Sequence, residues 1–128
     1  VEPNDTAAFA GGPYPGEVIT ASIRPAYDVD WFAITLDATA SLTAEVIGTA
    51  SFACVAGDID SELWVTAGDG VTVLGHDDDV DAPGGNYCSR VSVPSLVAGT
   101  YLVTVSASQT YAPDVTFDYR LRVVLGPP

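Results

Sequence analysis

The sequence predicts an all-β protein, an antiparallel β-sandwich with jelly-roll-like connections, and three observations support this fold class. Short segments rich in Val, Ile, Leu, Thr, Tyr and Phe alternate between apolar and polar residues, the period of a half-buried strand. Gly, Pro and Asp separate these segments at short, fairly even intervals. No segment has a convincing helical period. With 128 residues, the chain is expected to form a single domain over residues 1–128.

The elements can be placed in chain order from these patterns. Residues 1–16 hold several glycines and prolines and are expected to form an irregular arm rather than a strand or helix. Alternation predicts eight strands, over residues 17–23, 27–36, 41–47, 62–66, 71–74, 87–93, 101–106 and 115–125. We expect the second and third strands to pair as an antiparallel hairpin. The glycines near position 69 predict a tight turn between the fourth and fifth strands.

The balance of acidic and basic residues limits the kinds of molecule that this protein is expected to bind. The chain has 17 acidic residues against 4 basic ones, a formal net charge of −13. All four basic residues are arginines. A nucleic acid or an anionic membrane surface is therefore not expected as a partner, because both require a basic surface. No apolar run is long enough to cross a bilayer. The clustered aspartates favour cation binding, and an acidic, salt-adapted surface is the alternative.

The first candidate cation site lies at the start of the second strand. Asp28 and Asp30 are two residues apart, so they share one side of an extended chain, where like charges repel. No lysine exists in the sequence, and Arg24 is the nearest arginine in the chain. Calcium, a hard cation that prefers oxygen ligands, is the simplest compensation.

A second candidate cation site combines aspartates from both ends of the fourth and fifth strands. If these strands pair, the residues before one and after the other meet at one edge of the hairpin. The alternative is a solvated acidic loop, and the spacing is not that of an EF-hand. The aspartates concerned are Asp58, Asp60, Asp77, Asp78, Asp79 and Asp81.

The two cysteines, Cys54 and Cys88, are relevant to whether the protein is secreted or cytosolic. An even count suggests a disulfide in a secreted chain and two buried thiols in a cytosolic one, and we favour the disulfide.

Catalysis is not expected from this sequence. His76 is the only histidine, it stands beside an acidic run, and no cluster has the ligand spacing of a zinc site. A hydrolase built on a carboxylate pair is the remaining catalytic alternative. The large aromatic residues are expected mostly in the core or at its edge. Tyr27 and Tyr111 fall in loops and are the expected exposed aromatics, available to face a ligand.

Five pieces of the sequence, in one order, resemble the bacterial pre-peptidase C-terminal domain, a family related to the collagen-binding domains of clostridial collagenases. They are the arm Glu2-Pro3-Asn4-Asp5, the stretch Asp28-x-Asp30-Trp31-Phe32, the stretch Asp58-x-Asp60-x-x-Leu63-x-Val65, the aspartate-rich loop, and Ala98-Gly99-Thr100-Tyr101 with its following strands. The resemblance covers nearly the whole chain. It implies a jelly-roll sandwich without catalytic activity.

The resemblance also implies a calcium ion that joins the arm to the second strand. Carried over position by position, its ligands are Glu2, Asn4, Asp5, Asp28 and Asp30. The expected function is that of a calcium-stabilised accessory domain of a secreted bacterial enzyme, most simply a peptidase. Its partner would be the parent catalytic domain in the same polypeptide, which it would help to fold, to be secreted or to attach to an insoluble protein or polysaccharide. The alternative is a carbohydrate- or fibrous-protein-binding module that uses exposed aromatics. Thr104, Ser106 and Ser108 stand where collagen-binding relatives carry large side chains, which weakens a collagen-binding role.

Overall fold

The structure, a computed structural model, describes residues 11–13, 18–49, 59–78, 88–109 and 114–128. These residues form nine strands and no helix. None of them belongs to a helix that could span a membrane. The strands are β1 (Gly11–Pro13), β2 (Val18–Ile23), β3 (Val29–Leu36), β4 (Ala40–Ile47), β5 (Ser61–Ala67), β6 (Val73–Asp77), β7 (Arg90–Leu96), β8 (Gly99–Ala107) and β9 (Phe117–Gly126).

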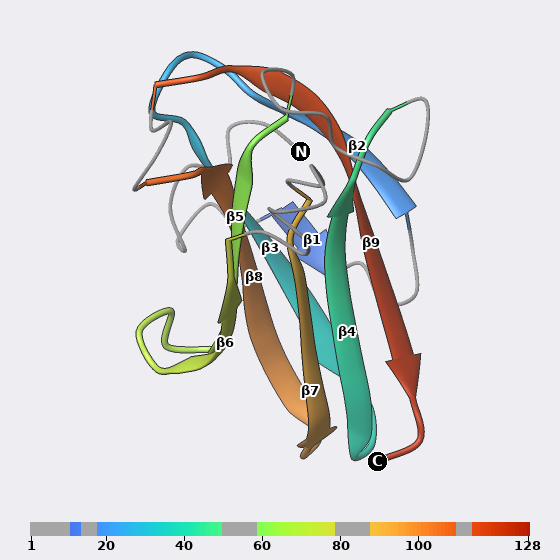
Figure 1. Cartoon of the computed structure of the whole chain (residues 1–128). Helices are drawn as coiled ribbons and strands as arrows, with labels where there is room; N and C mark the ends of the chain where they lie inside the picture. The colour runs from blue at the N-terminus through green and yellow to red at the C-terminus, as the bar shows by residue number, and fades with distance from the viewer. Residues whose placement is uncertain (1–10, 14–17, 50–58, 79–87, 110–113) are drawn as a thin grey trace.

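The strands form two sheets with the order of a jelly roll (Figure 1). One sheet has the order β1-β3-β8-β5-β6 and the other has the order β2-β9-β4-β7. The antiparallel pairs β2–β9, β3–β8, β4–β7 and β5–β6 are nested inside one another along the chain. Such a ribbon of paired strands, wound so that successive pairs fall in alternate sheets, defines the jelly roll. The predicted fold class is confirmed.

The core lies between the two sheets because each strand turns alternate residues inward. In β3 the inward positions are Asp30, Phe32, Ile34 and Leu36, all buried. The four-stranded sheet contributes fully buried side chains such as Leu42 and Leu121 from β4 and β9. The central strand β8 differs, because its outward positions are buried as well, with Thr104 at 5% and Ser106 at 1% exposure.

The predicted hairpin of the second and third strands is wrong. Strand β3 pairs with β1 and β8, whereas β4 pairs with β9 and β7 in the opposite sheet. The link across residues 37–39 therefore crosses from one sheet to the other. The prediction failed because alternation shows only that each strand has one buried face. Two such strands can bury these faces either as hydrogen-bonded neighbours in one sheet or as members of two sheets that pack face to face.

Three smaller expectations also change. Part of the arm, β1, pairs in parallel with β3, so residues 11–13 are strand rather than irregular chain. Strand β6 begins at Val73 and runs on to Asp77, which takes His76 and Asp77 out of the expected acidic loop. Strand β7 runs on to Leu96, past residue 93, where the predicted strand ends.

The predicted turn between β5 and β6 is confirmed, and Asp69 organises it. Its carboxylate accepts hydrogen bonds from the backbone N–H groups of Val71 and Thr72, both at 2.9 Å, and from the Thr72 hydroxyl at 2.7 Å. These donors lower the pKa of Asp69 to about 2. Gly70 closes the turn with a φ of 73°, a conformation that glycine adopts without strain.

Candidate functional site

The first candidate site is built around a buried carboxylate at the start of β3. Asp30 faces the core with 0% exposure. Its Oδ2 accepts a hydrogen bond of 2.6 Å from the hydroxyl of Tyr119, which is equally buried in β9. Because β3 and β9 lie in different sheets, this bond joins the two layers across the core. A buried carboxylate requires such partners, since its desolvation is costly.

Asp28, two residues before Asp30, is buried as well, which agrees with the predicted shared side. It is 8% exposed, and its Oδ2 accepts a hydrogen bond of 3.1 Å from the Arg24 backbone N–H. Its own N–H donates to the Pro25 carbonyl at 3.2 Å, which closes the turn into β3. Tyr27, within that turn, has a φ of 69°. Two buried carboxylates therefore stand at the mouth of β3, held by a turn on one side and by the opposite sheet on the other.

The remaining predicted ligands of this first site, Glu2, Asn4 and Asp5, lie outside the described residues. The calcium site that would join them to Asp28 and Asp30 stays a prediction.

At the second candidate site, the structure brings two of the six predicted aspartates together. Asp60 precedes β5 and Asp78 follows β6, and the pairing of these strands places them at the same edge, as predicted. Ser108 bridges them, because its hydroxyl donates to Asp78 Oδ2 at 3.1 Å and its N–H donates to the Asp60 carbonyl at 2.9 Å. Oδ1 of each aspartate is buried and has no hydrogen-bond partner among the described residues.

The electrostatics of this pair are unfavourable without a cation. Burial raises the pKa of Asp60, and the charges of Asp78 and Glu62 raise it further. Burial also raises the pKa of Asp78, partly offset by the Ser108 hydrogen bond. A carboxyl with a raised pKa in the folded state stabilises the fold below its ordinary pKa of 3.8, and this stability is lost as the pH rises through the raised value. At neutral pH the pair therefore opposes folding.

Of the other four aspartates of this candidate site, the structure describes Asp77 alone. Asp77 Oδ2 accepts a hydrogen bond of 2.9 Å from the Arg90 N–H at the start of β7. Asp58, Asp79 and Asp81 lie outside the described residues. Within the described ranges, no group of three or more His, Cys, Asp and Glu residues is arranged to hold a metal ion.

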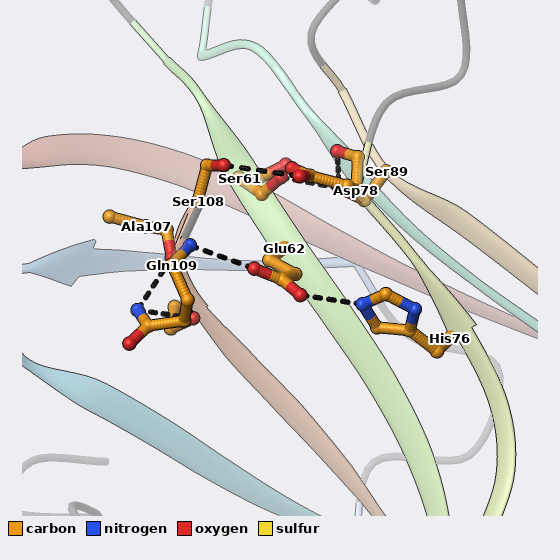
Figure 2. A network of polar contacts seen from close by, with 9 residues as sticks. Ser61, Glu62, His76, Asp78, Ser89, Ala107, Ser108 and Gln109 are labelled. Carbon is orange, nitrogen blue, oxygen red and sulfur yellow. Dashed lines mark hydrogen bonds and ion pairs between the residues drawn. The ribbon is translucent and has the colours of Figure 1, made fainter. Parts of the chain in front are cut away.

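A network that the sequence analysis missed surrounds Glu62, beside the aspartate pair (Figure 2). Glu62 is 7% exposed, and its two carboxylate oxygens bond to the His76 Nε2 at 2.6 Å and the Gln109 N–H at 2.8 Å. Strand register explains the contact, because His76 lies opposite Trp64 and thus diagonally across from Glu62. His76 is therefore a hydrogen-bond partner of Glu62 in the sheet rather than a member of the acidic loop.

Buried hydroxyls connect this edge to β7. The Ser89 hydroxyl donates to the carbonyls of Asp78 at 2.6 Å and Ser61 at 2.8 Å, and it lies 2.8 Å from the Ser61 hydroxyl. Ser61 and Ser89 are both fully buried. These bonds hold the Asp78 backbone in place and so fix the end of β6 at which the aspartate pair forms.

The remaining sequence-based assignments have different outcomes. Cys88 is buried at 3% exposure, and the described residues include no free cysteine. Its predicted disulfide partner, Cys54, lies outside the described residues, so the disulfide stays a prediction. Tyr27 is exposed as expected, at 69%. Tyr111 lies outside the described residues.

The expectation that most aromatics lie in the core or at its edge holds for Tyr101, Phe117 and Tyr119, whereas the two tryptophans lie on the opposite face of the sheet. Trp31 and Trp64 occupy the outward positions of β3 and β5, where each is half-buried. The alternation itself contained this information, since Trp31 precedes the inward Phe32 and Trp64 follows the inward Leu63.

Taken together, the jelly-roll topology and the carboxylate pairs at strand ends define a small β-sandwich module with candidate cation sites. The family comparison identifies it further. The model of the bacterial pre-peptidase C-terminal domain matches residues 28–107, more than half of the chain, and the chain belongs to this family. The family comprises accessory domains carried by peptidases.

Two solved structures share the fold. The pre-peptidase C-terminal domain of a collagenase from Bacillus anthracis is 10% identical, with a TM-score of 0.63, over 89% of this chain and 95% of that one. PliG from Aeromonas hydrophila, a periplasmic inhibitor of g-type lysozyme, is 16% identical, with a TM-score of 0.55, over 90% of this chain and 99% of that one. At these identities the likeness concerns the fold. A comparison with curated protein sequences finds no match.

Proposed function

We propose that this domain is a non-catalytic, calcium-stabilised accessory module of an exported peptidase. Its family membership supports the accessory role, since domains of this family are attached to peptidase catalytic domains. Its partner is then a catalytic domain in the same polypeptide, which it helps to fold, to be secreted or to attach to an insoluble substrate.

One observation carries the calcium part of the proposal. Asp60 and Asp78 lie at one edge of the β5–β6 pair, and each has a buried oxygen that no described group satisfies. Burial raises the pKa of both carboxyls, and the charge of Asp78 raises that of Asp60 further. A divalent cation with oxygen ligands removes this repulsion. Asp28 and Asp30, buried at the mouth of β3, form the second point at which calcium would bind, together with Glu2, Asn4 and Asp5 of the arm.

Calcium is expected to raise the melting temperature of the isolated domain. At a calcium concentration a hundredfold above Kd, the gain in stability is about 2.7 kcal/mol, a shift on the order of 10 °C for a domain of this size. The measurement is a thermal melt at pH 7 and fixed ionic strength with calcium, with magnesium and with EGTA. Equal melting temperatures in calcium and EGTA would contradict the calcium part of the proposal.

Two variants locate the ion in the same experiment. Asp60→Asn should raise the melting temperature in EGTA, because it removes the repulsion, and should abolish the calcium shift if the ion binds there. Asp28→Asn should reduce the shift if the ion binds at the mouth of β3. Asp37→Asn, in the exposed link between β3 and β4, removes the same charge outside both sites and should leave the shift intact. A full shift in both site variants would rule out both locations.

A disulfide between Cys54 and Cys88 would fit an exported protein, because such bonds persist in oxidising compartments. We expect alkylation of the denatured, unreduced chain to modify neither cysteine. Modification of both without a reductant would contradict the disulfide.

A further inference from the structure

The outward face of the five-stranded sheet carries a groove that neither the family assignment nor the cation sites explain. Its volume is about 360 Å³, within the usual range of small-ligand pockets. Trp31 and Trp64 line it from β3 and β5, and Thr104 and Ser106 line it from β8, which lies between these strands. Both tryptophans of the chain therefore border one groove.

Strand register sets the spacing of the two indoles. Thr104 is the direct partner of Trp31 in one strand pair and of Trp64 in the other, so the three residues form a row across the sheet. Neighbouring strands lie about 4.8 Å apart, which places β3 and β5 roughly 10 Å from each other. On its other side Trp64 contacts the His76 ring, with centroids 5.2 Å apart, and this contact restricts the indole. The row thus places the buried Thr104 hydroxyl between two aromatic walls.

The hydroxyl between the walls is the feature that points to a ligand. Thr104 is 5% exposed, lines the groove, and its Oγ1 has no hydrogen-bond partner among the described residues. A buried hydroxyl without a partner costs free energy, and native structures rarely leave one unsatisfied. A ligand group that both donates and accepts hydrogen bonds would satisfy it.

Gln109 adds a second fixed polar group at the groove. Its Nε2 donates to the Ala107 carbonyl at 2.8 Å and to the Ser106 hydroxyl at 3.3 Å, while its backbone N–H is held by Glu62. Figure 2 shows Gln109 held in this way beside Glu62. Its amide is therefore fixed in position before any ligand arrives, which lowers the entropic cost of binding.

The charge of the groove restricts the class of ligand. None of the described side chains that line it is charged, and the chain as a whole carries a net charge of −13. An anionic ligand would meet no cation there and would be repelled by the protein as a whole. The ligand should therefore be neutral, with a flat face to stack on an indole and hydroxyls to bond with Thr104 and Gln109. A purely apolar ligand would leave Thr104 unsatisfied.

We propose that this groove binds a pyranose ring of a neutral polysaccharide, stacked on Trp31 and Trp64 and hydrogen-bonded to Thr104. The C–H groups on the face of a sugar ring match the negative face of an indole, and the ring hydroxyls supply both donors and acceptors. This inference rests on the attachment role within the proposed accessory function, for which it names the ligand class. It does not depend on calcium.

The test uses native gels that contain a soluble neutral polysaccharide, namely mixed-linkage β-glucan, xylan or glucomannan. We expect at least one of them to retard the domain, and its oligosaccharides to change the tryptophan emission, which arises only from this groove. Trp31→Ala and Trp64→Ala should each weaken binding at least tenfold. Thr104→Val, which keeps the shape and removes the hydroxyl, should weaken it several-fold without lowering the melting temperature, because the hydroxyl has no partner in the free protein. Thr43→Val, the same change on the exposed face of β4, should bind as the wild type does.

Several outcomes would overturn the proposal. One is no retardation by any of the three polysaccharides, and another is retardation that survives both tryptophan substitutions. A change in tryptophan emission with a proline-rich peptide but with no oligosaccharide would assign the groove to protein ligands. Gels and thermal melts, each in calcium and in EGTA, separate this proposal from the calcium proposal. Retardation by a polysaccharide with equal melting temperatures in the two buffers supports the groove proposal alone. A higher melting temperature in calcium without retardation overturns the groove proposal alone.

Discussion

Replacing Phe32 with alanine is expected to lower the free energy of unfolding by about 3–5 kcal/mol, the usual cost of removing a buried phenylalanine. Phe32 is 1% exposed and is one of the largest side chains packed between the two sheets. Its loss removes apolar contacts and leaves a cavity that the β3–β8 ladder prevents the backbone from filling. Urea denaturation followed by tryptophan fluorescence gives the measurement.

Two controls bracket this result. Ile34→Val, the next inward position of β3, removes one methylene and should cost about 0.5–1.5 kcal/mol. Val124→Ala changes a side chain of β9 that is 49% exposed and should stay within about 0.5 kcal/mol of the wild type. A loss for Phe32→Ala as small as that for Val124→Ala would contradict the assignment of the inward face of β3.

Removing the hydroxyl of Tyr119 is expected to have the second large effect. Tyr119→Phe leaves the Asp30 carboxylate without its bond to the opposite sheet, at a cost of about 1–3 kcal/mol. Asp30→Ala should destabilise the domain by a similar amount. Because the two groups bond directly, the double variant should lose less than the sum of the two single losses, by at least about 0.5 kcal/mol.

Calcium separates the two roles assigned to Asp30. If Asp30 also binds the ion, Asp30→Ala should cost more in calcium than in EGTA, whereas Tyr119→Phe should cost nearly the same in both. Denaturation of all four proteins of the cycle in both buffers provides the comparison. Strictly additive losses would show that the hydrogen bond contributes nothing to stability. Equal costs of Asp30→Ala in both buffers would contradict calcium binding by Asp30.

The strands were predictable to different degrees, for a physical reason. Alternation identified the inward residues of β3, because a half-buried strand must place apolar side chains on one face. The same signal cannot distinguish a hairpin partner from a strand of the facing sheet, and β4 was accordingly paired wrongly. In β6 the pattern was too short to show that the strand continues to Asp77, because edge strands bury little.

Some features of the candidate sites could likewise be predicted from the sequence, whereas others depend on the tertiary structure. That Asp28 and Asp30 share a side follows from their spacing alone, and their burial agrees with it. The meeting of Asp60 and Asp78 needed only the pairing of β5 with β6. The hydrogen bond between Asp77 and the Arg90 backbone N–H could not be predicted, because it depends on how β7 is placed relative to β6. The bond between Asp30 and Tyr119 joins residues 89 positions apart, and only the packing of the two sheets creates it.

By itself, the sequence determined the all-β class, the inward faces of the strands and the carboxylate pairs at their ends. These features depend on residue spacing within a strand or on a single hairpin, so local alternation and turn chemistry were sufficient. The tertiary structure alone decided the nested pairing of the jelly roll, the Glu62 network and the Trp31–Thr104–Trp64 row. Each of these unites strands that are distant in the chain, and their register follows from the whole pattern of core burial rather than from any one segment.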